Sequence, residues 1–373
     1  MPLLGDITSR IDDPYLAHAC ALALRARGRT APNPLVGCVV VADGRIVGEG
    51  FHPRAGEAHA EVFALADAGP AARGAEVYVT LEPCAHHGRT PPCADALIAA
   101  GVSRVVIGMR DPNAEAAGGA KRLAEAGIEV AFASDPAPFA ELNAGWLKRL
   151  ATGMPRVIAK VGVSLDGKIA LTAGERASMT GAGGSRVTMR LRDSVDAVLV
   201  SAATVAADDP SLTVRDASGT PAEHQPLRVV LARKTMPPTD AALLRDQAAP
   251  TLVLAPQGAS LPALPPHVVC ATYEPAAGLR GALAALGARG VSDLLVEPGP
   301  RLLAALASQH LIDELVVVTA GGFAGDSAPS LFAGDSADAG DGVLRHSLCP
   351  AQTGIVDDVS FTVWRPCAAD EDQ

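Results

Sequence analysis

Residues 56–65 read GEAHAEVFAL and place His59 two positions before Glu61. Residues two apart on a helix point to nearly opposite sides. Both side chains can therefore serve one site only if they lie at the start of the helix, where its first turn faces that site. The stretch predicts a helix that begins beside a functional centre, and the rest of that centre must come from elsewhere in the chain.

The rest comes from LEPCAHHGRTPPC, residues 81–93. Cys84 follows an apolar run and a proline, and Cys93 follows two prolines at the start of the helical pattern CADALIAAG. A helix N-terminus and a nearby cation both favour the thiolate form, which is the form that binds metal. One imidazole and two thiolates make a tetrahedral zinc site with its fourth position open, whereas structural zinc normally has four protein ligands. His59, Cys84 and Cys93 therefore predict a catalytic zinc.

Glu61 completes the predicted chemistry. Zinc lowers the pKa of bound water from about 15.7 to roughly 7, which gives a nucleophile at neutral pH. That reaction needs a proton carrier, and Glu61 is the available one. A His-x-Glu followed by Pro-Cys and a second Cys is the pattern of zinc-dependent base deaminases. Each piece alone has an ordinary explanation, such as chance or a small buried cysteine, and it is their combination and order that favour catalysis.

Composition limits the remaining possibilities. The chain has 373 residues, so two domains are expected. It is 49% hydrophobic, 19% charged and 3% aromatic, with a net charge of −10, which is typical of a soluble globular protein and disfavours nucleic acid as a partner. The N-terminal residues are acidic where a signal peptide needs basic ones, and no apolar run is long enough for a membrane span. The seven cysteines are scattered and odd in number, which argues against a disulfide framework and predicts a cytoplasmic protein.

Apolar runs alternate with helical patterns along the chain, which predicts α/β architecture. LVGCVVV and DGRIVGEG predict a hairpin turned at Asp43-Gly44. A helical pattern ends near residue 150 and MPRVIAKVGV begins a new strand, so we expect domains at 1–150 and 151–373. The second half repeats the alternation, with loops expected around 216–226 and 321–343.

The chain resembles a known family in TAPNPLVGCVV, GFHPRAGEAHAEV, VTLEPCAHHGRTPPC and MRDPN with AGIEV. Eight residues, AHHGRTPP, separate the two cysteines in place of the usual two of deaminases. These features resemble the bifunctional deaminase/reductase of bacterial riboflavin biosynthesis over nearly the whole chain. The resemblance implies a cytidine-deaminase-like three-layer αβα domain followed by a dihydrofolate-reductase-like α/β domain. It also implies deamination of 2,5-diamino-6-(5-phosphoribosylamino)pyrimidin-4(3H)-one and then NADPH reduction of its ribosyl group to ribityl.

The resemblance assigns roles in the first half. The zinc ligands match His59, Cys84 and Cys93, and the proton donor matches Glu61. Asn33 falls where the family holds the pyrimidine, and a simple Asn-Pro turn is the alternative explanation for it. His52 and His86 fall at the mouth of the same site, and either alone is an ordinary surface residue.

The second half has no G-x-G-x-x-G and no Walker loop. The resemblance rests there on KVGVSLDGKIA, VDAVLVSAATVAADDPSLTVR and VEPGP. By position it assigns nicotinamide-cofactor contacts to Gly162, Thr204 and Asp208 and substrate contacts to Arg192, Leu212, Arg215 and Glu297. Arginine forks suit a sugar phosphate, and Gly299, at the start of a helix, would offer backbone N–H groups to a cofactor phosphate.

Four departures from the family pattern lie in the second half. Ser178 replaces a tryptophan, Arg176 a serine, Ala232 an aspartate, and Pro298 a glycine, which removes an N–H donor. Two hypotheses follow: a bifunctional enzyme with zinc in one domain and NADPH in the other, or a deaminase whose C-terminal domain has become an oligomerisation or binding module. The acidic charge and the long loop between the cysteines disfavour a third, a nucleic-acid-editing deaminase. We expect a homo-oligomer that binds a phosphoribosylated pyrimidine and neither nucleic acid nor membrane.

Overall fold

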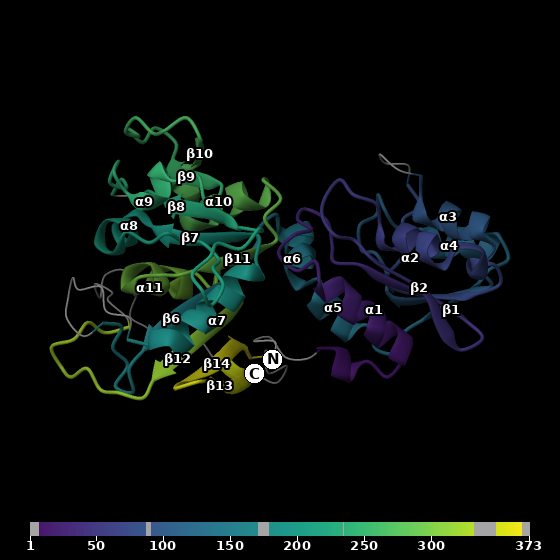
Figure 1. Cartoon of the computed structure of the whole chain (residues 1–373). Helices are drawn as coiled ribbons and strands as arrows, with labels where there is room; N and C mark the ends of the chain where they lie inside the picture. Colours follow the sequence, from purple (N-terminus) through teal and green to yellow (C-terminus); the bar gives the residue numbers. More distant parts are fainter. Residues whose placement is uncertain (1–6, 87–90, 171–178, 234, 332–347, 368–373) are drawn as a thin grey trace, which may run out of the picture. The chain divides into compact units, whose positions relative to one another are not determined.

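The computed structural model describes residues 7–86, 91–170, 179–233, 235–331 and 348–367 (Figure 1). The chain divides into two compact units, one spanning Asp6–Ala151 and the other the residues from Thr152 onward. Ser178 and Arg176 lie outside the described residues. No helix in the described ranges combines the length and the apolar character that crossing a membrane requires.

The first unit contains a five-stranded sheet in the order β2-β1-β3-β4-β5, in which β3, β4 and β5 are parallel and β1 is antiparallel to both its neighbours. Its elements are η1 (Ile7–Arg10), α1 (Pro14–Leu24), β1 (Gly37–Ala42), β2 (Arg45–Phe51), α2 (Ala60–Ala68), η2 (Gly69–Ala72), β3 (Glu76–Leu81), α3 (Cys93–Ala100), β4 (Arg104–Met109), α4 (Gly119–Glu125), β5 (Glu129–Phe132), α5 (Ala137–Leu142) and α6 (Ala144–Thr152). Asp43 and Gly44 both have positive φ between β1 and β2, which confirms the predicted hairpin turn.

Helices cover both faces of this sheet (Figure 1). Apolar residues of α2, α3 and α4 pack on one face with Val77, Val105 and Ile107. Residues of α1, α5 and α6 form a second core on the other face, against Tyr78 and Val106. Successive strand residues thus point to opposite cores, as the period of a buried strand requires. The result is the expected three-layer αβα arrangement.

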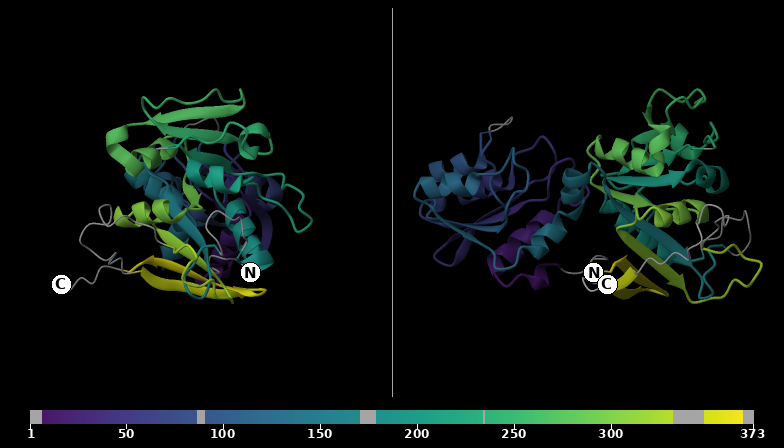
Figure 2. Two further views of the ribbon diagram at one scale, coloured as in Figure 1. Left: turned by 90° about the vertical axis from the view of Figure 1, so that its left-hand side faces the viewer. Right: turned by 180° about the vertical axis from the view of Figure 1, so that it is seen from behind.

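The second unit contains a nine-stranded sheet in the order β10-β9-β8-β7-β11-β6-β12-β14-β13, parallel from β10 to β12 and antiparallel beyond. Figure 2 shows the C-terminal strands in yellow at one edge of this sheet. Its elements are β6 (Arg156–Val163), α7 (Gly181–Asp193), β7 (Ala197–Ser201), α8 (Ala202–Asp208), β8 (Leu227–Leu231), α9 (Ala242–Arg245), β9 (Thr251–Pro256), β10 (Val268–Tyr273), η3 (Pro275–Ala277), α10 (Gly278–Gly287), β11 (Asp293–Val296), α11 (Pro300–Ser308), β12 (Glu314–Ala320), β13 (Leu348–Val356) and β14 (Val359–Pro366). Residues of α10 and α11 pack on one face, and residues of α7, α8 and α9 on the other.

The order of the strands fixes where a ligand can bind. The chain runs outward from β7 to β10, then returns to insert β11 between β7 and β6. The carboxyl ends of β7, β11 and β6 therefore meet at a point where the strand order reverses, which is where open parallel sheets bind their ligands.

One disulfide, Cys349–Cys367, joins the ends of the β13–β14 hairpin. The cysteine pattern predicts no disulfide framework, and this single bridge within one hairpin is a feature that the sequence pattern did not indicate. Cys84 and Cys93 are free thiols.

Candidate active sites

His59 and Glu61 lie at the N-terminus of α2. His59 is the residue that precedes the helix, with an extended backbone (φ −77°, ψ 163°), and Glu61 lies in the first turn. Two residues that are two positions apart point in different directions only when both are helical. Because His59 lies outside the helix, its side chain can point to the same side as that of Glu61. Glu61 is buried, and its carboxyl group interacts with His59, Cys84 and Cys93.

The two cysteines meet His59 from separate elements. Cys84 follows β3, and Cys93 is the first residue of α3. His59 Nδ1 lies 3.2 Å from Cys93 Sγ and 3.7 Å from Cys84 Sγ. The backbone N–H of Cys93 donates to Cys84 Sγ at 3.3 Å. The structure thus brings together the residues that the sequence singled out as zinc ligands.

A tight packing contact and a buried carboxylate hold the Cys84 segment. Glu82 is buried, and its Oε1 accepts hydrogen bonds from the N–H groups of Gly118 and Ala120 at the start of α4, both at 3.1 Å. The backbone of α4 also packs directly on the segment, because a Cβ added at Gly119 would lie 1.8 Å from the carbonyl oxygen of Pro83. The position of Cys84 therefore depends on α4 as well as on β3.

The charges of these groups are coupled. A hydrogen bond to Cys84 raises the pKa of His59. Hydrogen bonds from Cys93 and His59 lower the pKa of the Cys84 thiol, and the bond to Cys84 raises the pKa of the Cys93 thiol. Burial raises the pKa of Glu61 above that of an ordinary glutamate. The cluster favours a negative charge on sulfur next to a carboxyl group that can bind a proton.

The donor set fits a zinc ion. The ligand atoms of His59, Cys84 and Cys93 all lie within 4.8 Å of one another. One nitrogen and two sulfurs are the soft donors that zinc takes in tetrahedral sites, and three protein ligands leave a fourth position for water or substrate.

Asn33 and His52 lie beside this cluster. Asn33 Nδ2 is 3.0 Å from His52 Nε2, and His52 Nδ1 is 3.0 Å from the carbonyl oxygen of Ala58. Since a carbonyl only accepts, Nδ1 bears the hydrogen and Nε2 accepts from the Asn33 amide. Burial lowers the pKa of His52, which favours this neutral form. The His52 and His59 rings are in edge contact, with centroids 5.6 Å apart, whereas His86 is exposed.

Three of the predicted cofactor contacts, Gly162, Thr204 and Gly299, lie near the carboxyl ends of β6, β7 and β11. Thr204 lies in α8, which follows β7 directly, and Gly299 is the residue before α11, in the turn after β11. A Cβ added at Gly299 would lie 3.7 Å from Thr204 Oγ1, so these two predicted cofactor contacts are neighbours. Pro298 and Pro300 have no N–H, so the donors of this turn are those of Gly299, Arg301 and Leu302. Gly162 lies in β6, and Asp208 is the last residue of α8.

A charged cluster lies at the same edge of the sheet. Arg192 and Glu297 form a two-pronged ion pair with N–O distances of 2.7 and 3.0 Å. Burial raises the pKa of Glu297, but Arg192 and Lys160 outweigh it and the net shift is downward, so Glu297 is ionised. Arg192 also donates from Nη1 to the carbonyl oxygen of Thr213 at 3.1 Å. Three of its five N–H groups thus bond to the protein itself, which reduces what it can offer a phosphate.

The structure adds two residues that the sequence reasoning missed. Lys160 lies in β6. Burial lowers its pKa, and the opposing effect of the Glu297 charge is too small to reverse this. Its signal was a lysine within an otherwise apolar strand pattern. Asp111 follows β4, beside the segment after β3, and burial raises its pKa, as do the charges of Glu82 and Cys84. The sequence feature that could have identified Asp111 is its place after a strand, because the carboxyl ends of adjacent parallel strands lie at the same edge of the sheet.

Three other positions affect the predicted reductase site. Leu212 is 1% exposed and its side chain packs in the core, so a substrate contact there must use its backbone. Arg215 is exposed. Ala232, where the family pattern has aspartate, is fully buried.

Comparison with known proteins identifies both halves. Residues 9–109 match the family model described as the cytidine and deoxycytidylate deaminase zinc-binding region, and residues 155–353 match the RibD C-terminal domain. The chain is 44% identical to riboflavin biosynthesis protein RibD of Escherichia coli K12 over 332 residues, which is 86% of this chain and 90% of that protein.

Solved structures agree with this. Acinetobacter baumannii RibD superposes with a TM-score of 0.84 at 37% identity, covering 95% of this chain and 98% of that one. The Thermotoga maritima diaminohydroxyphosphoribosylaminopyrimidine deaminase/5-amino-6-(5-phosphoribosylamino)uracil reductase superposes with a TM-score of 0.83 at 31% identity, covering 97% and 99%.

Fold and site together define a zinc-binding deaminase domain joined to a reductase domain. The chain belongs to the RibD family of riboflavin biosynthesis proteins, and it is a bifunctional deaminase and reductase that uses zinc and NADPH. The fold class, the activities and the cofactors that the sequence resemblance implied are thereby confirmed. The roles of individual residues stay predictions.

Proposed function

We propose that residues 1–150 deaminate 2,5-diamino-6-(5-phosphoribosylamino)pyrimidin-4(3H)-one and that residues 151–373 then reduce 5-amino-6-(5-phosphoribosylamino)uracil with NADPH. The observation that supports the first step most strongly is the cluster of His59, Cys84, Cys93 and buried Glu61. The name of the Thermotoga maritima relative, which includes both reactions, supports this choice of substrates.

In the deaminase site, His59, Cys84 and Cys93 would hold zinc, which supplies a nucleophile at neutral pH by making water more acidic. Glu61 would take one proton from the attacking water and pass it to the ring nitrogen. It would then take the remaining proton of the hydroxyl added to the ring carbon and pass it to the amino group, which leaves as ammonia. Its burial and raised pKa suit this exchange, because a proton carrier works best when its pKa lies near the working pH. Asn33, held by His52, orients the pyrimidine beside Glu61.

In the reductase site, Gly162, Thr204, Asp208 and Gly299 contact NADPH, which supplies the hydride. Arg192, the backbone of Leu212, Arg215 and Glu297 contact the substrate. Arg215 is the exposed cation of this set and the best candidate for the phosphate, since Arg192 is largely occupied by Glu297 and Thr213. The charges of Lys160 and ionised Glu297 interact beside these proposed contacts.

We also propose a cytoplasmic location, because the thiols of Cys84 and Cys93 must stay reduced to bind metal. The Cys349–Cys367 bridge, which lies within one hairpin, is the observation that stands against a reducing compartment. A homo-oligomer is supported by β13, which lies at the edge of the nine-stranded sheet and exposes Ile355. Light scattering of the purified protein gives its mass in solution directly.

The proposal is tested with the purified zinc-loaded protein and the diaminopyrimidine phosphate. Ammonia release measures the first step, and loss of NADPH absorbance measures the second. We expect both, in that order. Ammonia release without NADPH oxidation at any substrate concentration would instead support a deaminase with a non-catalytic C-terminal domain.

A further inference from the structure

The segment between α8 and the turn before β8 contains an unusual backbone. Residues 209–215, here called the substrate loop, include Leu212 and Arg215. Asp209 and Leu212 have positive φ angles of 39° and 52°. Residues other than glycine rarely have a positive φ, and this backbone conformation persists only where the surroundings hold it in place. The contacts that hold the substrate loop are therefore of interest.

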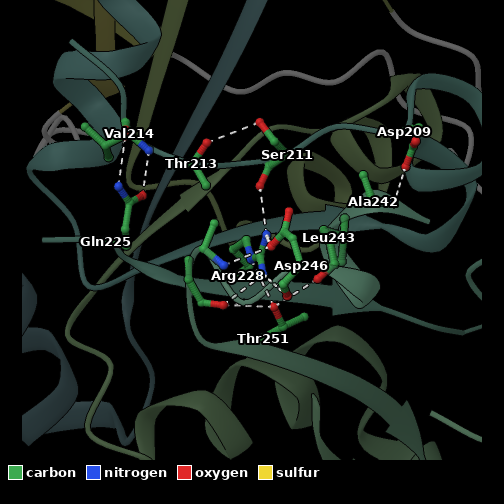
Figure 3. A network of polar contacts seen from close by, with 12 residues as sticks. Asp209, Ser211, Thr213, Val214, Gln225, Arg228, Ala242, Leu243, Asp246 and Thr251 are labelled. Atoms are coloured by element: carbon green, nitrogen blue, oxygen red, sulfur yellow. Dashed lines mark hydrogen bonds and ion pairs between the residues drawn. The ribbon is translucent and has the colours of Figure 1, made fainter. Parts of the chain in front are cut away.

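Arg228 provides one of these contacts (Figure 3). It lies in β8 with its side chain fully buried. Its Nη1 donates to the carbonyl oxygen of Ser211 at 3.2 Å and pairs with Asp246 Oδ1 at 2.7 Å. Its Nε donates to Thr251 Oγ1 at 2.9 Å, and Nη2 donates to the carbonyl oxygen of Ala249 at 2.8 Å. Arg228 thus fastens the residue before Leu212 to the connection between α9 and β9.

Gln225 provides the contact on the other side of Leu212 (Figure 3). Its Oε1 accepts from the N–H of Val214 at 2.7 Å, and its Nε2 donates to the carbonyl oxygens of Val214 at 2.9 Å and Ala222 at 2.8 Å. One side chain therefore bonds to both backbone groups of Val214, whose carbonyl oxygen also accepts from the N–H of Ala222 at 3.0 Å. Val214 directly precedes Arg215.

Further bonds complete the arrangement. Asp209 Oδ1 accepts from the N–H of Ala242 at 2.7 Å, and Arg192 donates to the carbonyl oxygen of Thr213. Arg215 Nε donates to Thr213 Oγ1 at 3.0 Å, so the direction of the Arg215 side chain depends on the loop that precedes it. The loop is fixed at four residues, Asp209, Ser211, Thr213 and Val214, by side chains or backbone groups that lie apart from the proposed nicotinamide contacts.

We propose that Gln225 and Arg228 are positioning residues of the reductase, which hold the substrate loop so that the Leu212 backbone and the Arg215 guanidinium meet the phosphoribosyl group. This rests on the substrate contacts proposed above. It predicts that the two residues govern the KM for the deaminated pyrimidine and leave the KM for NADPH unchanged, because Arg228 and Gln225 bond within the loop to Ser211 and Val214 and to none of the proposed nicotinamide contacts.

Gln225→Met is the test variant, since it keeps the length of a half-buried side chain, whereas loss of the buried Arg228 charge can prevent folding. Gln257→Met, an exposed glutamine in the same unit, is the matched control. Gln225→Met should raise the KM for the deaminated pyrimidine about fivefold. The KM for NADPH and the kcat should stay within about twofold, as should all constants of the control.

A double-mutant cycle separates positioning from general weakening. In an Arg215→Ala background, Gln225→Met should change the pyrimidine KM by less than about twofold, because the group it positions is gone. Hydrogen exchange of residues 209–216 should be faster in Gln225→Met than in the unmutated protein or the control. Additive effects, an equal rise in the KM for NADPH, or unchanged exchange would overturn the positioning role. Failure of the unmutated protein to oxidise NADPH would overturn the proposed function itself.

Discussion

At the scale of single residues, Glu61 is the residue whose role, as a metal ligand or as a proton carrier, an experiment can decide. It lies in the first turn of α2, buried against His59 and both cysteines. We predict that Glu61→Gln, which keeps the size and removes the titrating group, lowers the deamination rate by about 100-fold or more while the zinc content stays at one per chain. Metal analysis beside the rate measurement checks this, and loss of zinc would make Glu61 a ligand.

The raised pKa of Glu61 also predicts a pH dependence. Glu61 must be ionised to accept the proton from water, and burial makes ionisation harder. As the pH is lowered, the rate of deamination should therefore begin to fall at a pH above about 4.3, which is the usual pKa of glutamate. A pH–rate profile with zinc content measured at each point tests this. A rate that stays constant down to that value would show that the proton carrier is another group.

The cysteines give a third prediction. Cys84→Ser and Cys93→Ser should each lose both zinc and deamination, because a hydroxyl is a far weaker zinc ligand than a thiolate. The buried Cys20, which lies in the core on the other face of the sheet, supplies the matched variant Cys20→Ser. Full zinc occupancy in both ligand variants would contradict the assignment.

The proposed zinc ligands could be singled out from sequence, and the structure brings them together. Each has a local signal: a histidine at a helix start, and cysteines after a strand and before a helix. Lys160, Gln225 and Arg228 had none of comparable strength. Their importance comes from partners brought together by the sheet, such as Glu297 beside Lys160 and Asp246 beside Arg228. A buried arginine with several backbone acceptors looks, in sequence alone, like any charged residue in a strand.

At the scale of elements, the contact of α4 with Pro83 predicts an effect at a distance from the ligands. A methyl group at Gly119 has no room against the Pro83 carbonyl, so either α4 or the Cys84 segment must move. Gly119→Ala should therefore weaken zinc binding and deamination together, measured by zinc titration of the metal-depleted protein. Gly321→Ala, where a methyl group meets no atom within 4 Å, is the control. Unchanged zinc affinity would show that α4 can shift independently.

Elements with strong local patterns were also predictable. The hairpin at Asp43-Gly44 and the helix ended by Gly69 follow from turn and cap chemistry and are confirmed. The hairpin of β13 and β14 was missed. Most residues of β13 are at least partly exposed, as suits a strand at the edge of a sheet, so the alternation of apolar and polar residues is weak there.

At the scale of the whole molecule, each unit has its own core and its own site. Distant and independent sites seldom couple by more than about 0.5 kcal/mol. We predict that Asp208→Ala abolishes NADPH-dependent reduction and leaves zinc content and deamination within about a factor of two. Parallel assays of both steps on one preparation check this. A matching fall in deamination would mean that the two halves are not energetically separate.

The strand order described above also has a consequence for how the protein is made. β11 lies at the centre of the nine-stranded sheet, between β7 and β6, yet it follows β6, β7, β8, β9 and β10 in the chain. Chains emerge from the ribosome at about 5–20 residues per second and domains generally fold as units. β6 and β7 are therefore synthesised well before β11. Until β11 emerges, the backbone groups on their facing edges lack their hydrogen-bonding partner. The strands of the first unit are all encoded before those of the second. Unpaired strand edges promote aggregation, so we expect the nascent chain to be most prone to aggregate while the second half is being synthesised.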